Sequence, residues 1–295
     1  MSISGIIIVD KPPEWTSHDV VAKLRGVFKI KRIGHGGTLD PMATGVLPIF
    51  VGRATRAAEF CENAEKEYIA GLRPGVVTDT QDITGSILSS ISVSVNESDL
   101  SVLLQHFLGE QKQIPPMYSA IKQDGKKLYE LARRGIDVPR QARDIRISVL
   151  ELLKRDGQDF LLRVVCSKGT YIRTLCHDIG TALGCGATMS SLRRTRAGAF
   201  TIGMAHDLSE IISSATTGNA AETLMPVDSI FAEYPSVRLS DADTRRSKNG
   251  ALNRVRDHVD GTYRFYGPDD EFLALCDVKN GEVKTIKNFF EVQHI

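Results

Sequence analysis

The irregular order of strand-like and helix-like runs constrains the fold of this chain more than any other feature of its sequence. Residues 5–9 are an apolar run typical of a buried strand, and residues 17–28 have the spacing of an amphipathic helix with Ser17 as its N-cap. Later runs alternate without the regular strand–helix–strand repeat of a doubly wound sheet. We therefore expect an α+β fold.

Further elements are expected from the spacing of apolar residues and from the turn residues beside them. They are a strand within 64–72, a helix at 100–107 after Asn96, a helix at 126–134 ended by Gly135, strands at 145–153 and 160–166, and a helix at 170–183. After about residue 230 the sequence changes to short strand-like runs separated by tight turns. This change predicts a larger domain over residues 1–230 and a small β domain over 231–295.

Length and composition exclude several classes of protein. The 295 residues fit about two domains, 42% of them are apolar, and the net charge is only +1. The apolar run near the N-terminus is too short for a signal peptide or a membrane span, so we expect a cytoplasmic protein without membrane contact. The five cysteines contain no C-x-x-C pair and fit no common zinc site, which favours reduced thiols and no metal.

Positive charge is concentrated in a few segments. Residues 23–38 contain five Lys or Arg and no acid, and residues 111–147 carry nine Lys or Arg against four Asp or Glu. Arg193, Arg194 and Arg196 form a third cluster. Basic stripes on a nearly neutral protein suit a polyanion that docks on one face, although such runs are also compatible with ordinary solvated surface.

The most informative motif is the glycine-rich segment 34–48. Four glycines in twelve residues permit backbone conformations that side chains forbid. Asp40 followed by Pro41 is also an ordinary helix start, with Asp as N-cap and Pro at the first helical position. The glycine spacing matches neither of the common phosphate-binding patterns, and no Lys follows. Likewise, Gln81 and Ile83 stand at the alternate ligand positions of segment 78–83, which excludes a calcium loop there.

This segment, Gly-His-Gly-Gly-Thr-Leu-Asp-Pro-Met-Ala-Thr-Gly-Val-Leu-Pro, resembles the catalytic motif of the TruB family of tRNA pseudouridine synthases. Other segments resemble family motifs in the same order. They are Asp-Lys-Pro-Pro-Glu-Trp-Thr-Ser-His at 10–18, and segments 66–68, 78–85, 113–122, 166–175 and 192–194. The resemblance spans about residues 5–200, with two departures. Glu14 replaces the usual Gly, and Gly36 replaces the usual Thr.

The resemblance implies a pseudouridine-synthase fold, with a mixed, mainly antiparallel central sheet flanked by helices and loops. It also implies a basic RNA-gripping insert at about 108–147 and a small, β-rich, PUA-like RNA-binding domain at the C-terminus. In that domain the residues expected to touch RNA are Arg245, Arg246, Lys248 and Gly250. A β appendage of another kind is also compatible with the sequence.

For the reaction, the resemblance implies that Asp40 is the catalytic carboxylate and that Arg173 pairs with it. Isomerising uridine to pseudouridine replaces a C–N bond by a C–C bond without a redox step or an energy input, so neither an organic cofactor nor a metal is expected. An ionised carboxylate suits a covalent role, and a nearby cation keeps a buried carboxyl ionised. The sequence does not reveal the order of bond-making steps.

The resemblance also assigns contacts to RNA. A flipped uridine is expected to stack on Tyr68, to meet Tyr171 and Leu192, and to leave a space that His35 fills. Phosphate contacts give affinity without reading sequence. The residues expected to make RNA contacts of this kind are Lys11, Ser119, Lys122, Lys126, Lys127, Arg193 and Arg194.

The expected substrate is the T-arm of tRNA, with modification at position 55, by a monomer that needs no protein partner. Two other readings stay open. One is a non-catalytic RNA-binding or RNA-remodelling protein on the same scaffold. The other is a nucleotide-dependent metabolic enzyme that uses the loop at 34–45 and therefore binds a mononucleotide.

Overall fold

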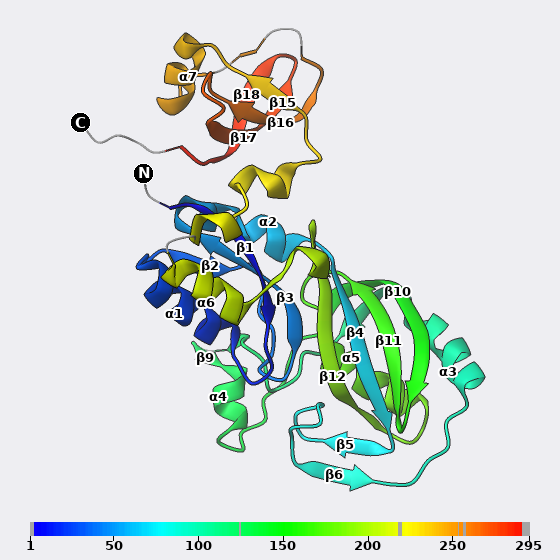
Figure 1. Cartoon of the computed structure of the whole chain (residues 1–295). Coiled ribbons are helices and arrows are strands. Elements are labelled where there is room, and N and C mark those ends of the chain that lie inside the picture. The colour runs from blue at the N-terminus through cyan, green and yellow to red at the C-terminus, as the bar shows by residue number, and fades with distance from the viewer. Residues whose placement is uncertain (1–2, 124, 218–219, 253, 256–257, 291–295) are drawn as a thin grey trace.

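The computed structural model describes residues 3–123, 125–217, 220–252, 254–255 and 258–290. It shows a large mixed sheet covered by helices and a separate small sheet at the C-terminus (Figure 1). The C-terminal sheet lies at the end of the molecule opposite the segment that carries α4 and β9 (Figure 1). No helix among the described residues is long and apolar enough to span a membrane.

The main sheet has ten strands, and most neighbouring strands are antiparallel. Only the β1–β14 and β3–β12 pairs are parallel among the pairings described within it. Eight strands follow one another in space in the order β14 (His206–Asp207), β1 (Gly5–Lys11), β3 (Thr44–Val51), β12 (Ala187–Ala197), β4 (Lys66–Pro74), β11 (Asp159–Cys166), β10 (Arg143–Asp156) and β7 (Gly109–Gln113). Two short strands pair outside this order, β2 (Ile33–His35) with β3 and β13 (Phe200–Thr201) with β12. The expected α+β fold with a mixed, mainly antiparallel sheet is confirmed.

The sheet is buried on both faces near its centre, which explains the continuous apolar run of β1. Ile7 and Val9 belong to one hydrophobic core, whereas Ile6 and Ile8 belong to another. Successive side chains of a strand point to opposite faces, so a strand covered on both sides must be apolar throughout. Strand β1 is thus packed against both hydrophobic cores, although only the short β14 lies outside it in the sheet.

Most helices lie around this sheet and at its ends, whereas α7 lies beside the small C-terminal sheet (Figure 1). The helices are α1 (Ser17–Phe28), α2 (Ala58–Asn63), α3 (Glu97–Leu104), α4 (Leu128–Ala132), α5 (Ile172–Ala182), α6 (Leu208–Thr216) and α7 (Asp241–Lys248), with 3₁₀ turns at Gly52–Ala57, Gln105–Phe107, Ile202–Met204, Ala220–Thr223 and Val227–Phe231. The N-cap expected for α1 was wrong by one residue. Thr16 and Asp19 form a reciprocal capping box, whereas the Ser17 hydroxyl exchanges hydrogen bonds with the backbone of Leu39.

The insert is less helical than its sequence suggests. Lys126–Lys127 forms β9, which pairs with β8 (Lys122–Gln123), and only Leu128–Ala132 is α-helical. Gly135 has the positive φ of 71° that suits a glycine after a helix end. The expected helix at 126–134 is therefore wrong in its first two and its last two residues, because residues 133–134 form a turn. A further hairpin outside the main sheet pairs β5 (Val76–Thr78) with β6 (Ile87–Ser90).

The C-terminal sheet has its own core and a defined contact with the rest of the protein. It consists of β15 (Ser236–Arg238), β16 (Gly261–Tyr266), β17 (Phe272–Lys279) and β18 (Glu282–Asn288). Helix α7, which the sequence did not predict, begins after the N-cap Ser240. Phe231 packs against Phe272 and Phe289 with ring centroids 6.0 and 5.8 Å apart. The aromatic contact fixes the small sheet against the end of the domain that contains the large sheet.

Candidate active site

Asp40 and Arg173 form a two-point ion pair between a loop and the first turn of α5. Nε of Arg173 lies 2.9 Å from Oδ2 of Asp40, and its Nη2 donates to Oδ1 at 3.3 Å. The Asp40 side chain is 36% exposed, whereas that of Arg173 is only 6% exposed. Solvent thus reaches the carboxylate and not the guanidinium, as is required of a carboxylate that meets a substrate.

Asp40 does not begin a helix. The backbone N–H of Ala43 donates to the Asp40 carbonyl at 3.1 Å, which closes a turn before β3. The helix-start interpretation of Asp40-Pro41 is therefore wrong, and the motif is a loop that carries the carboxylate to Arg173.

The guanidinium of Arg173 is held from its far side by a loop that the sequence analysis did not assign to the site. Asp82 Oδ2 lies 3.8 Å from Nη1 of Arg173, and the Thr80 carbonyl accepts from Nη1 at 3.3 Å. Asp82 is itself fixed, since its Oδ1 accepts from the backbone N–H of Thr84 at 3.0 Å. The motif at 78–85 therefore supports the arginine.

The charge state of Asp40 depends on this arrangement. Burial raises the pKa of the Asp40 carboxyl above its usual range, and the nearby charge of Asp82 adds to the rise. The positive charges of Arg173 and Lys11 act in the opposite direction and lower the pKa of Asp40. The ion pair is thus what favours the ionised form of the partly buried Asp40.

Lys11 is fully buried and ties two loops together. Its Nζ donates to the carbonyls of Pro12, Trp15 and Pro41 at 2.8, 2.6 and 3.1 Å. Burial lowers the pKa of Lys11 to about 8. Because every donor direction is used inside the protein, the structure contradicts the predicted RNA contact of Lys11. Its position indicates that it fixes the loop that follows Asp40.

Arg194 is also buried, with 1% of its surface exposed. Its guanidinium donates to the carbonyls of Val46, Gly37 and Thr38 at 2.7, 3.1 and 3.4 Å. These bonds hold the glycine-rich loop in place. The guanidinium is therefore not accessible to a phosphate. The predicted RNA contact of Arg194 is therefore contradicted as well.

Two of the four side chains expected around the uridine, Tyr68 and Tyr171, lie within electrostatic range of Asp40. Tyr68 of β4 is 9% exposed and Leu192 of β12 is 8% exposed, and both belong to the core that also contains Leu39. Burial raises the pKa of both the Tyr68 and the Tyr171 phenol, and the Asp40 charge acts in the same direction on each. The two phenols are therefore neutral at neutral pH and lie within the field of the carboxylate.

His35 lies at the end of β2, beside His18, with their ring centroids 5.1 Å apart. Burial lowers the pKa of His35 to about 4, with the charges of His18 and Arg194 acting in the same direction. Its Nδ1 is buried and makes no hydrogen bond within the described structure. A neutral imidazole with an unused polar atom at this place is compatible with a space-filling role beside a substrate.

Both departures from the family pattern have a visible structural setting. Glu14 has a φ of 66°, the left-handed conformation that favours glycine, and its N–H donates to the Pro41 carbonyl at 2.8 Å. At Gly36 an added Cβ would lie 2.7 Å from Cε2 of Phe50 and 3.0 Å from Cβ of Cys61. This chain therefore tolerates strain at residue 14 and uses the space beside residue 36 for its core.

The remaining residues expected to contact RNA differ in exposure. Lys122 and Lys126 are exposed on the β8–β9 hairpin, and Lys127 is half-buried against the Tyr129 ring. Ser119 is buried. The side chain of Arg193 is 43% exposed and pairs with Asp10 at 2.6 Å, so its charge is largely neutralised.

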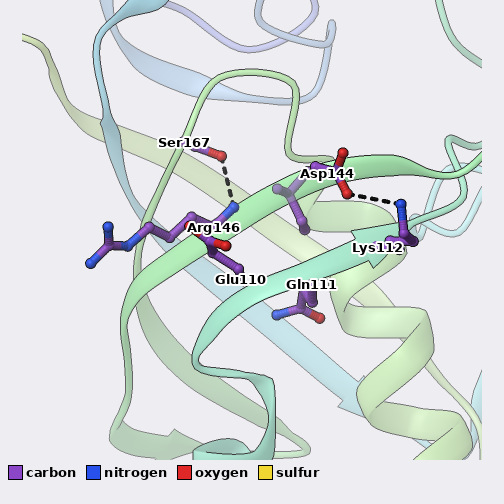
Figure 2. Close-up of a pocket in the computed structure, with 7 residues that line it drawn as sticks. Glu110, Gln111, Lys112, Asp144, Arg146 and Ser167 are labelled. Atoms are coloured by element: carbon purple, nitrogen blue, oxygen red, sulfur yellow. Dashed lines mark hydrogen bonds and ion pairs between the residues drawn. The ribbon is translucent and has the colours of Figure 1, made fainter.

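A hollow of about 560 Å³ lies elsewhere, along β7 and β10. Figure 2 shows its lining, in which Lys112 pairs with Asp144 at 3.0 Å and the Ser167 hydroxyl accepts from the Arg146 N–H at 2.9 Å. None of its lining residues belongs to the group around Asp40. Because it lies away from Asp40 and Arg173, this wide hollow is not the candidate active site.

Comparison with known proteins matches two domain models to this chain. The model of the TruB family pseudouridylate synthase N-terminal domain matches residues 25–172, and that of the tRNA pseudouridylate synthase B C-terminal domain matches residues 173–232. The chain is 43% identical over 288 residues to a tRNA pseudouridine synthase B of Syntrophomonas wolfei, covering 96% of each chain. It is 46% identical over 281 residues to one of Pseudomonas putida, covering 94% of this chain and 92% of that one.

A solved structure with a similar fold is a crystal structure of a Cbf5-Nop10-Gar1 complex. Its matching chain has a TM-score of 0.74 and 29% identity, covering 97% of this chain and 85% of that chain. The fold and the matched domains are those of a pseudouridine synthase, an isomerase that acts on RNA. The chain belongs to the TruB family of these enzymes, as its sequence motifs predicted.

Proposed function

We propose that this enzyme converts the uridine at position 55, in the T loop of tRNA, to pseudouridine, with Asp40 as the catalytic carboxylate. Membership of the TruB family supports the conversion of uridine to pseudouridine in tRNA. The observation that carries the role of Asp40 is its partly exposed carboxylate, held at two points by a buried arginine.

In the proposed reaction the bond between C1′ of the ribose and N1 of uracil breaks, and a bond between C1′ and C5 forms. The hydrogen lost from C5 is balanced by one gained at N1, so no electrons leave or enter the nucleoside. Asp40 attacks the nucleoside or removes a proton from it while the base turns. The buried guanidinium of Arg173 holds the carboxylate in its ionised form and in a fixed orientation.

The uridine reaches Asp40 by leaving its stack in the folded loop, at a cost of a few kcal/mol. Stacking on an aromatic ring returns about 1–3 kcal/mol per base. We assign this contact to Tyr68, with Tyr171 and Leu192 completing the pocket and His35 filling space beside the vacated stack. Their burial around the carboxylate supports the assignment.

RNA docking is assigned to exposed cations at some distance from the carboxylate. Lys122, Lys126 and Lys127 of the insert are placed to meet phosphates of the T-arm. We assign residues 231–295 to a PUA-like domain that contacts tRNA through Arg245 and its neighbours near the end of α7. The enzyme acts as a monomer without a protein partner, in the cytoplasm where tRNA is modified.

The replacement Asp40→Asn tests the role of the carboxylate while keeping the shape of the side chain. Purified parent and variant are incubated with unmodified tRNA transcript, and pseudouridine is mapped at single-nucleotide resolution. The parent is expected to modify position 55 only, whereas the variant binds tRNA but forms no product. Product at the normal rate from the variant would exclude Asp40. Parent protein that remodels tRNA without forming product would instead support the non-catalytic function.

A further inference from the structure

Gln113 connects the base of the insert to the candidate active site. It is the last residue of β7, is 4% exposed, and lies opposite Arg143 of β10 in the strand register. Its neighbour Lys112 lines the hollow of Figure 2, and its side chain is 71% exposed. Side chains alternate along a strand, so Gln113 is directed to the interior of the protein.

The carboxamide of Gln113 binds both backbone polar groups of one residue. Its Oε1 accepts from the Tyr171 N–H at 2.8 Å, and its Nε2 donates to the Tyr171 carbonyl at 3.1 Å. Two bonds to the same residue restrain both its position and its orientation. Because the amide is buried, the loss of either bond leaves a polar group without water to replace the partner.

Tyr171 is a position where such a restraint matters. It is the N-cap residue of α5, and its side chain makes no capping bond. Its carbonyl also accepts the first bond of the helix, from the Leu175 N–H at 3.0 Å. Gln113 therefore anchors the start of the helix that carries Arg173 two residues later.

A second contact from the same segment reaches Arg173 itself. The carbonyl of Tyr118 accepts from Nη2 of Arg173 at 2.9 Å, the same nitrogen that donates to Asp40. Residues 113–118 thus touch the backbone of Tyr171 and the guanidinium of Arg173. The segment leads directly into the β8–β9 hairpin, whose exposed lysines we assign to RNA docking.

We propose that Gln113 is a positioning residue for pseudouridine formation, which fixes Tyr171 and the start of α5 against the uridine held at Asp40. The inference rests on the proposed function, because that function places Tyr171 in the uridine pocket. Gln113 is buried and does not reach RNA, so its loss affects the chemical step rather than docking. A displacement of about 1 Å at a reacting centre costs about 10²-fold in rate.

Two replacements test this role with the full-length protein and tRNA transcript. Gln113→Met keeps the length of the side chain but removes both polar atoms. Its kcat is expected to fall about 10²-fold, while the Kd for tRNA changes by less than about two-fold. Thermal melting confirms that the variant is folded at the assay temperature. Gln111→Met is the matched control, since Gln111 lies on the same strand and bonds only to the Phe107 carbonyl.

Gln113→Glu provides a readout that a purely structural role would not give. An ionised carboxylate accepts from the Tyr171 N–H but places its second oxygen against the Tyr171 carbonyl. A protonated carboxyl restores the missing donor. Burial raises the pKa of such a group. The kcat of this variant, divided by that of the parent at the same pH, is therefore expected to rise as the pH falls.

The outcomes separate this inference from the proposed function. Parental kcat in Gln113→Met would overturn the positioning role, as would an increase of Kd with kcat unchanged. A Glu variant as impaired as the Met variant at every pH would also overturn it. If the parent forms no pseudouridine at position 55, the proposed function fails and the inference fails with it. If the parent is active and the Gln113 variants have its kcat, the inference is refuted and the proposed function is not.

Discussion

Cations of the catalytic cleft and cations of the insert are the same residue types in opposite surroundings. Those of the cleft are buried and surrounded by carbonyl or carboxylate oxygens; they are Lys11, Arg173 and Arg194. Those of the insert lie on the hairpin surface or against an aromatic ring; they are Lys122, Lys126 and Lys127. The difference shows that burial turns a basic residue of a motif into a support for backbone carbonyls, whereas docking of a polyanion, as we propose for the insert, needs an exposed one.

The largest contrast is expected between the neighbours Arg194 and Arg193. Arg194→Met leaves three buried carbonyls without a donor and should lower the free energy of unfolding by about 3–5 kcal/mol. Arg193→Met breaks a partly exposed ion pair and should cost at most about 1 kcal/mol. Denaturant unfolding of both variants measures the two losses. Equal losses would contradict the division into buried and exposed cations.

Arg173 is expected to affect the rate and its pH dependence together. Asp40 reacts as the carboxylate, so activity is present above its pKa and is lost as the pH falls through it. Since Arg173 opposes the rise caused by burial, Arg173→Gln should move the acid limb of kcat to higher pH and lower kcat by about 10²-fold. Arg173→Lys keeps the charge and should move the limb less. If the acid limb of kcat for Arg173→Gln lies at the same pH as that of the parent, Arg173 does not control the ionisation of Asp40.

Because of Lys11, the free energy of unfolding is expected to depend on pH in the alkaline range. The pKa of Lys11 is about 8 in the folded protein and near its usual 10.5 in the unfolded chain, so the unfolded chain binds more protons between these values. Stability relative to Lys11→Met should therefore rise across this window, by about 2–3 kcal/mol in total. Denaturant unfolding of both proteins at a series of pH values measures it. A constant difference would mean that Lys11 keeps an ordinary pKa.

The smallest effect is expected on the insert. Lys126→Ala combined with Lys127→Ala should leave the chemical step intact and flatten the dependence of log affinity on log salt, by about one to two phosphate contacts. Lys154→Ala, an exposed lysine near the far end of β10, is the control and should leave the slope unchanged. Binding of tRNA over a range of salt concentrations gives the slopes. An unchanged slope in the double variant would remove the hairpin from the docking face.

Some elements that build the site were not predictable from local pattern. Strand β12 contains three arginines and two serines beside few apolar residues, yet it lies in the middle of the sheet. Its polar side chains are accommodated because Arg194 finds carbonyls of the glycine-rich loop across the sheet. The sequence alone gives no sign that these partners, about 150 residues earlier, are in reach.

The sequence by itself determined the motif order, the strand β1 with its apolar run, the catalytic carboxylate candidate and the family. These follow from local spacing and from segments short enough to be read along the chain. The tertiary structure alone decided which cations are buried, that Asp82 supports Arg173, and that Gln113 holds Tyr171. Each of these depends on contacts between segments far apart in sequence, where burial sets both the charge state and the partners of a polar group.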